Sequence, residues 1–387
     1  MASSQPRPLP SPRPLGTAGR RSRLVAWIGL GLLLSSVHVV VGTLWAMSPG
    51  TPRPFLDQAG HVVPGSISEK IHVDINGVEQ GMFIKGRNRS NPILLWVHGG
   101  PGMPDYFLTQ QHPTGLEDLF TIVWWDQRGA GLSYGPGIAR DTMNVEQYIA
   151  DTLAVTDYLR ERFGQDKIYL LGHSWGSFIA IQAAARAPER YAAYIGMGQM
   201  VHQLESEKLA YDYMLTEYRR RGDTGMVHDL EAAPVSMTGG TPDQYLKVRD
   251  KAMHGLGIGT THEMKSVITG IFLPSLRFPE YTVSEKINLW RGRAFSGSFG
   301  LWDQFLRVDL RQTVPRLDLP AYFLEGAYDY TCSSSLALDY FHKLSAPVKG
   351  FYRFNNSAHS PILEQPALAR NILRTDVLAK INSLSVG

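Results

Sequence analysis

Cysteine is nearly absent from this chain, because Cys332 is the only one among 387 residues. A single cysteine excludes an intrachain disulfide, so the fold depends on a hydrophobic core, for which 43% of hydrophobic residues is ample. We interpret Cys332 itself as a small buried apolar residue.

Metal and cofactor signatures are also missing from the sequence. The 12 histidines form no H-x-H or H-E-x-x-H pair, and no Cys/His cluster has zinc spacing. There is no P-loop and no G-x-G-x-x-G after an apolar run. We therefore predict that the protein uses neither a metal ion nor an organic cofactor.

Charge is nearly balanced over most of the chain. The formal net charge of +3 comes from 38 basic and 35 acidic residues. Five of the arginines fall within residues 1–23, and without them 33 basic residues face 35 acidic ones. The remainder is close to neutral, so we predict no nucleic-acid partner.

The N-terminal region has the composition of a membrane-inserted segment. Residues 1–23 are rich in proline and arginine and are predicted to be disordered. Residues 24–47 carry no formal charge and are long enough to cross a bilayer. The preceding arginines predict a cytoplasmic N-terminus, with the rest of the chain outside. We predict an uncleaved single-helix anchor followed by a linker over residues 48–64, and a cleaved signal with secretion is the alternative.

Beyond the linker, apolar runs alternate with helical patterns. Alternating residues around Asn76-Gly77 predict an antiparallel hairpin over residues 71–84. Continuous apolar runs predict strands at 92–97, 120–125, 168–171, 191–197, 321–324 and 350–354, and an amphipathic pattern predicts a helix over 145–163. This alternation is typical of a mostly parallel sheet covered on both faces, which is the α/β class.

The strand signal disappears between residues 199 and 315. Helical patterns replace it at 204–221, 242–254, 284–295 and 301–310. We predict a helical cap domain over 199–315, inserted between two parts of an α/β core at 65–198 and 316–387.

The stretch Gly172-His173-Ser174-Trp175-Gly176 lies between a predicted strand and a predicted helix. A serine on such a strained turn is the nucleophile elbow of α/β-hydrolases. The flanking glycines avoid a Cβ that would collide with the neighbouring strand or helix. Ser174 is therefore the predicted nucleophile, exposed at a helix N-terminus that favours negative charge. His173 is predicted to serve in packing.

A serine hydroxyl needs a base and a group that orients the base. Asp329 and His359 each follow a predicted strand, and the chain order of nucleophile, acid and histidine is that of this hydrolase class. We predict a triad of Ser174, Asp329 and His359.

The oxyanion of a tetrahedral intermediate needs two N–H donors. We predict that they come from Trp175, which follows the nucleophile, and from Gly100 in the glycine-rich loop after the first long strand. Gly99, beside it, is predicted to contact the substrate.

Three motifs together resemble the proline iminopeptidase family of α/β-hydrolases, over about residues 65–385. They are His98-Gly99-Gly100-Pro101-Gly102, Asp126-Gln127-Arg128-Gly129-Ala130-Gly131-Leu132-Ser133 and the elbow at 172–176. The resemblance implies a serine peptidase with a cap over its site, which releases an N-terminal residue from short peptides or aminoacyl amides. It also implies that Asp126 and Arg128 brace the loops around the oxyanion hole.

The family resemblance is weakest where the substrate amine would bind. These enzymes hold the free α-amine with carboxylates from the cap and from beside the catalytic acid, but here Tyr330 follows Asp329. Glu205, on the first predicted cap helix, is the predicted amine anchor. The alternatives are a carboxylesterase or amidase with the same triad, and a non-catalytic sensor of the same fold.

Overall fold

The computed structural model describes residues 17–387, so the disorder predicted for residues 1–16 lies outside the described part. Helix α1 (Thr17–Ala46) already includes residues 17–23, for which the sequence predicts disorder. The last proline of the tail is Pro14, and a helix can begin once proline no longer interrupts it.

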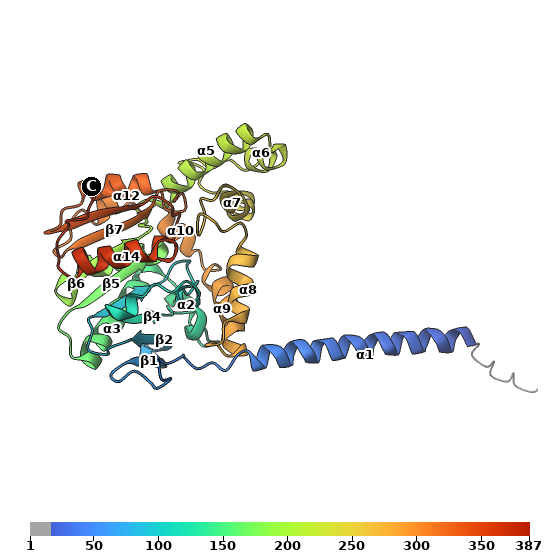
Figure 1. Ribbon diagram of the computed structural model, residues 1–387. Coiled ribbons are helices and arrows are strands. Elements are labelled where there is room, and N and C mark those ends of the chain that lie inside the picture. The colour runs from blue at the N-terminus through green and yellow to red at the C-terminus, as the bar shows by residue number, and fades with distance from the viewer. Residues whose placement is uncertain (1–16) are drawn as a thin grey trace, which may run out of the picture.

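Helix α1 projects away from the body of the protein (Figure 1). Its Val25–Ala46 stretch is long and apolar enough to cross a membrane, and none of it is buried against the rest of the chain. By length and composition alone, a signal sequence near an N-terminus can meet the same criterion.

One sheet of eight strands forms the centre of the body, in the order β1-β2-β4-β3-β5-β6-β7-β8. The strands are β1 (Ile67–Ile75), β2 (Val78–Gly86), β3 (Ile93–Val97), β4 (Thr121–Trp125), β5 (Ile168–His173), β6 (Tyr191–Met197), β7 (Ala321–Gly326) and β8 (Lys349–Phe354). β2 pairs antiparallel with both β1 and β4, and all the remaining pairs are parallel. The predicted hairpin and the predicted α/β class are both confirmed.

Both faces of the sheet are buried, which explains why its strands are continuous apolar runs. In β3, Leu95 and Val97 belong to one apolar cluster, and Leu94 and Trp96 belong to another on the opposite face. Helices α3 (Val145–Phe163), α4 (Trp175–Arg186) and α12 (Ser334–Lys343) contribute to the first cluster. Helices α2 (Tyr106–Gln111), α13 (Pro361–Glu364) and α14 (Pro366–Ile372) contribute to the second. The short turns η1 (Leu116–Asp118), η2 (Gly131–Ser133), η3 (Arg140–Thr142), η4 (Pro188–Arg190) and the π-helix η6 (Leu373–Val377) complete this part.

Helices alone connect β6 to β7. They are α5 (Gln203–Arg221), α6 (Thr224–Glu231), α7 (Asp243–Leu256), the π-helix η5 (Ile268–Phe272), α8 (Leu273–Arg277), α9 (Val283–Ser296), α10 (Leu301–Leu306) and α11 (Leu310–Thr313). Three lie where the sequence predicts helices, whereas residues 307–309 divide the fourth predicted helix in two. Helices α5, α6 and α7 enclose an apolar cluster of their own. The exact cap boundaries, residues 199 and 315, stay predictions.

Candidate active site

Ser174 lies on the sharp turn between β5 and α4, with a φ of 55° and a ψ of −123°. A Cβ added to Gly172 would come within 2.5 Å of the Ser177 Cα, and one added to Gly176 within 2.6 Å of the His98 carbonyl oxygen. The turn therefore requires both glycines, for the steric reason expected from the sequence. Ser174 is 8% exposed, so the prediction of an exposed nucleophile is wrong: the turn is buried beneath the surrounding loops.

Asp329 and His359 meet beside this turn. Asp329 Oδ2 lies 2.8 Å from His359 Nδ1, and Asp329 Oδ1 accepts backbone N–H bonds from Thr331 and Cys332 at 2.8 and 3.0 Å. Because carboxylates only accept, His359 Nδ1 carries a proton and Nε2 is left as a potential base. His359 Nε2 is buried and has no hydrogen-bond partner within residues 17–387.

Gly198 leaves the space that the acid–histidine pair occupies. Its φ is +56°, and a Cβ there would lie 2.8 Å from His359 Nδ1. The hydroxyl of Ser174 has its polar contact with Cys332 Sγ, at 4.0 Å, rather than with His359. Catalytic hydrogen bonds often form only once substrate is bound, so this geometry is compatible with a resting nucleophile. Cys332 is fully buried, as predicted.

The glycine-rich loop after β3 packs directly on the nucleophile. A Cβ on Gly99 would lie 3.1 Å from the Ser174 Cβ. Gly100 has a φ of +120°, which side chains rarely adopt, and a Cβ there would lie 2.6 Å from the Gly102 nitrogen. Trp175 is the first residue of α4, so its N–H has no acceptor inside the helix. Trp175 thus directly follows Ser174 and Gly100 directly follows the residue that packs on it, and their role as oxyanion donors stays a prediction.

Gln127 links the three sequence motifs, and sequence reasoning missed it. Its Oε1 accepts from Trp175 Nε1 at 2.9 Å, and its Nε2 donates to the His98 carbonyl at 2.7 Å. Its backbone N–H donates to His98 Nε2 at 3.1 Å. One buried amide therefore joins the elbow to the glycine-rich loop. Its position inside the Asp126–Ser133 motif was the available signal.

The Asp126 carboxyl binds the backbone of the loop that its own motif forms, over residues 126–133. Its Oδ2 accepts the Leu132 N–H at 2.8 Å, and a side chain on Gly131 would collide with that carboxyl. Burial raises the pKa of Asp126 to about 8. The carboxyl serves as a structural hydrogen-bonding group within the loop.

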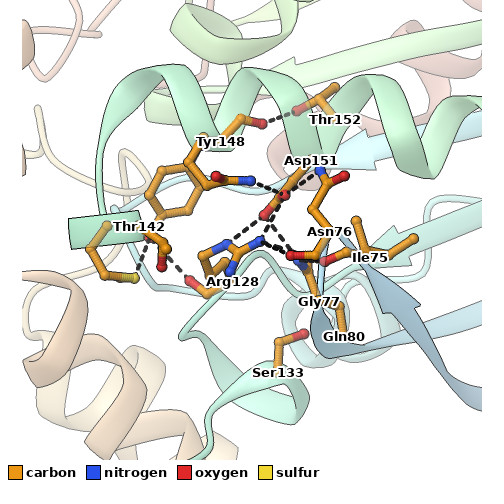
Figure 2. Close-up of polar contacts among 12 residues, drawn as sticks. Ile75, Asn76, Gly77, Gln80, Arg128, Ser133, Thr142, Tyr148, Asp151 and Thr152 are labelled. Atoms are coloured by element: carbon orange, nitrogen blue, oxygen red, sulfur yellow. Dashed lines mark hydrogen bonds and ion pairs between the residues drawn. The ribbon is translucent and has the colours of Figure 1, made fainter. Parts of the chain in front are cut away.

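Arg128 forms a buried ion pair with Asp151 of α3 (Figure 2). The guanidinium donates from Nε at 2.8 Å and from Nη2 at 2.9 Å. Asp151 also accepts from Asn76, Gln80 and Gln147, at 2.8 to 2.9 Å. Because each lone pair of the buried carboxylate has a donor, the pair fastens the β1–β2 hairpin and the Asp126–Ser133 loop to α3.

Two buried histidines near the nucleophile, His98 and His173, differ in their hydrogen-bond partners and therefore in protonation. His98 Nδ1 faces the Gly99 carbonyl while its Nε2 accepts an N–H, so the ring is neutral, and burial lowers its pKa to about 4. His173 Nδ1 faces the Asp105 carboxylate at 2.8 Å, and its Nε2 faces the His359 carbonyl at 3.1 Å. Both partners of His173 are acceptors, so both of its nitrogens carry protons. Burial opposes this charge, but Asp105 raises the pKa of His173 above its ordinary value.

Gln203 of helix α5 contacts Cys332, which in turn lies next to Ser174. Its Oε1 lies 3.7 Å from Cys332 Sγ, and its Nε2 donates to Glu207 at 2.8 Å. Glu207 is fully buried and is bound by Arg249, with Nη2 at 2.7 Å, and by the Tyr245 hydroxyl at 2.7 Å. Gln203 and Glu207 lie one helical turn apart, which was the only signal that they share a face.

Glu205 belongs to another face of α5. Its Oε2 lies 2.5 Å from Arg311 Nη2 and 3.7 Å from His202 Nδ1. Arg311 is in turn paired with Asp309 and Asp339. Glu205 therefore takes part in a partly exposed ionic cluster, and its role as an amine anchor stays a prediction.

Sequence and structure comparisons agree with this architecture. The profile of the alpha/beta hydrolase fold matches residues 92–366. The probable aminopeptidase YbaC of Bacillus subtilis (strain 168) is 32% identical over 310 residues, which cover 80% of this chain and 96% of that protein. The proline iminopeptidase of Clostridium botulinum is 36% identical over 103 residues, or 26% of this chain and 33% of that protein.

Among solved structures, a proline iminopeptidase-related protein from Thermus thermophilus superposes with a TM-score of 0.54. The match covers 81% of this chain and 98% of that protein, at 18% identity, and at that identity the likeness speaks for the fold. The family resemblance that the motifs predict is confirmed. The chain belongs to the α/β hydrolase fold family, with aminopeptidases and proline iminopeptidases among its relatives.

Proposed function

We propose that the protein is a serine hydrolase that releases an N-terminal residue from short peptides or aminoacyl amides. The observation that carries the proposal is the buried pair of Asp329 and His359, whose free Nε2 has no other partner in residues 17–387. The names of the relatives, a probable aminopeptidase and proline iminopeptidases, support the same class of substrate.

The mechanism follows from the roles of the residues. His359 Nε2 takes the proton of Ser174 as Oγ attacks the substrate carbonyl, and the N–H groups of Gly100 and Trp175 stabilise the oxyanion. His359 then protonates the leaving amine, and the acyl-enzyme forms. His359 Nε2 then takes a proton from water, which attacks the acyl carbon. As the tetrahedral intermediate collapses, the His359 imidazolium gives that proton to Ser174 Oγ, and the acid is released.

The substrate amine would be bound by a carboxylate of α5. Glu205 is the residue that the sequence favours, and Glu207 is the one whose contacts lead through Gln203 to the nucleophile. Gly99 would line the acyl site because it packs on Ser174.

The second candidate is an esterase or amidase with the same triad. One observation favours it: the two candidate carboxylates of α5 are already bound by guanidinium groups, Glu205 by Arg311 and Glu207 by Arg249. A site with compensated carboxylates has less negative charge to offer to a free amine.

A chromogenic panel distinguishes the candidates. Pro-, Ala- and Phe-anilides are compared with N-blocked anilides and short p-nitrophenyl esters. Hydrolysis restricted to free-amine anilides supports the aminopeptidase, and equal hydrolysis of N-blocked compounds or esters supports the esterase or amidase. No turnover of any compound, together with no labelling of Ser174 by a fluorophosphonate, would favour the sensor.

We also propose that α1 is an uncleaved anchor, with its N-terminus in the cytoplasm and the hydrolase outside. The apolar Val25–Ala46 stretch and the arginines before it support this orientation. N-terminal sequencing of the protein from membranes is the test: a mature N-terminus just after Ala46 would replace the anchor by a secreted enzyme.

A further inference from the structure

The chain that follows α1 is docked on the body, although the sequence predicts a linker there. Lys286 Nζ of α9 donates to Ser48 Oγ at 2.7 Å, and both residues are buried. The Gly50 N–H donates to the Pro279 carbonyl at 3.0 Å. Arg53 Nε lies 2.9 Å from Glu280 Oε1. Helix α1 therefore enters the body with no flexible spacer.

The fit of this docked segment is close. A side chain at Gly50, where φ is +74°, would collide with the Thr282 side chain at the start of α9. Trp45 and Pro49 border a hollow whose other wall is the first turn of α9. The end of α1 and the start of α9 thus lie side by side, as Figure 1 also shows.

Helix α9 has an apolar stripe next to its buried side. The buried side is formed by Lys286, Leu289 and Gly292. Val283, Ile287 and Trp290 follow one another at intervals of four and three residues, so they form one stripe, in which Val283 and Trp290 are partly buried. Ile287 is 52% exposed.

The neighbouring π-helix η5 extends this stripe. Ile268 and Phe272 are four residues apart, and they are 63% and 37% exposed. The Phe272 ring packs edge-on against Trp290, with the centroids 5.0 Å apart. We call the joint surface the η5–α9 face, and it consists of Ile268, Phe272, Val283, Ile287 and Trp290.

Three exposed basic residues lie close in the sequence to the residues of the η5–α9 face. Lys265, Arg277 and Arg291 are exposed, and none has an ion-pair partner within residues 17–387. Of the acids nearby, Glu285 is bound by Lys70, which leaves Glu263 as the exposed one. Exposed apolar residues with basic residues close by in the sequence are the composition of a surface that lies in a lipid headgroup layer.

We propose that the η5–α9 face rests on the surface of the bilayer that α1 crosses. The proposal relies on the proposed anchor, because α1 sets the position of the bilayer. In Figure 1, α8 and α9 stand beside the point where α1 leaves the body, on the side toward which α1 projects. With Ser48 fixed to Lys286, the first turn of α9 lies at the level where the apolar helix ends, which is the headgroup layer.

Site-specific quenching in nanodiscs tests the proposal. The full-length chain with Cys332→Ala receives one new cysteine, at Phe272 or Ile287 on the face, at Val37 in α1, or at Leu368 on α14. Each is labelled with the nitrobenzoxadiazole fluorophore and reconstituted in phosphatidylcholine and phosphatidylglycerol, with or without doxyl-labelled lipid. All four positions are exposed, so labelling leaves the core intact.

We expect the doxyl lipid to quench the fluorophore at positions 37, 272 and 287, and to leave position 368 unquenched. Quenching at 37 with none at 272 and 287 would overturn the proposal while the anchor stands. No quenching at 37 would instead overturn the anchor, and the docking of the η5–α9 face with it.

Discussion

The core side and the cap side of the active site are built differently. On the core side, Ser174 lies on a backbone turn that needs glycine at positions 172 and 176, Gly100 has a φ that favours glycine, and Gln127 joins the two loops. On the cap side, position depends on pairs of side chains far apart in the chain, such as Glu207 with Arg249. In the proposed mechanism, the core would fix where charge develops, and the cap would fix which groups surround the substrate. Changes to the core should therefore affect every substrate alike, whereas changes to the cap should discriminate among them.

The largest effect should come from Ser174→Ala, on the core side. Without the hydroxyl no acyl-enzyme forms, and kcat should fall by about 10⁴- to 10⁶-fold on anilides and esters alike. The measurement is steady-state turnover with fluorophosphonate labelling, and the urea midpoint of the variant should match that of the parent. Near-parental activity in the variant would exclude Ser174 as the nucleophile.

The second largest effect should be on stability, from Arg128→Met. The substitution leaves the buried Asp151 charge without its partner, which costs about 3–5 kcal/mol of unfolding free energy. Arg186→Met is the matched control, because Arg186 forms an exposed pair with Glu146 and its loss should cost less than about 1 kcal/mol. Urea unfolding measures both. Equal costs would mean that the Arg128 network does not fasten the core.

The core could be predicted from sequence because short motifs record backbone geometry. Gly172 and Gly176 are needed within the turn itself, so a five-residue pattern is enough to find Ser174. Asp329 and His359 could be found because loops at the carboxyl ends of parallel strands converge. Gln127 was missed because its partners, Trp175 and His98, lie in other motifs and no spacing rule relates them.

The cap was harder to predict because its helices record only which face is apolar. Nothing local distinguishes Glu207, which is buried, from Glu205, which pairs with Arg311 near the surface. Arg249, whose guanidinium pairs with the buried Glu207 carboxylate, is 42 residues away in the sequence. The sequence did not predict that the segment after α1 is docked on the body, because its partner Lys286 lies 238 residues from Ser48.

The next effect, on the cap side, should depend on the substrate. If Glu207 binds the amine, Glu207→Gln should raise KM for free-amine anilides by about 10- to 150-fold, the equivalent of one charged hydrogen bond. Glu205→Gln should have the smaller effect, because the contacts of Glu205 run to Arg311 and His202 rather than to Gln203 and Cys332. Short esters serve as the control substrate, and their kcat/KM should stay within about twofold. If Glu205→Gln raises KM for free-amine anilides more than Glu207→Gln does, Glu205 is the amine anchor that the sequence predicts. If both variants lose as much activity on esters as on anilides, neither residue binds the amine.

The smallest effect should appear in the pH dependence of stability, and it concerns His173. Its folded pKa is raised above the ordinary value of about 6.5, with burial opposing and Asp105 favouring the charged form. The stabilisation is therefore complete below about pH 6.5 and is lost as the pH rises through the raised folded pKa. His173→Gln should abolish this component, which we expect to be about 1 kcal/mol. Urea unfolding of both proteins from about pH 5 to about pH 9 measures it as a difference, because the titration of Asp126 is common to both.

A difference that grows toward alkaline pH would have the wrong sign for a charged His173. The bond between His173 and the His359 carbonyl would then join neutral groups, and the core side would lose a buried cation beside the nucleophile.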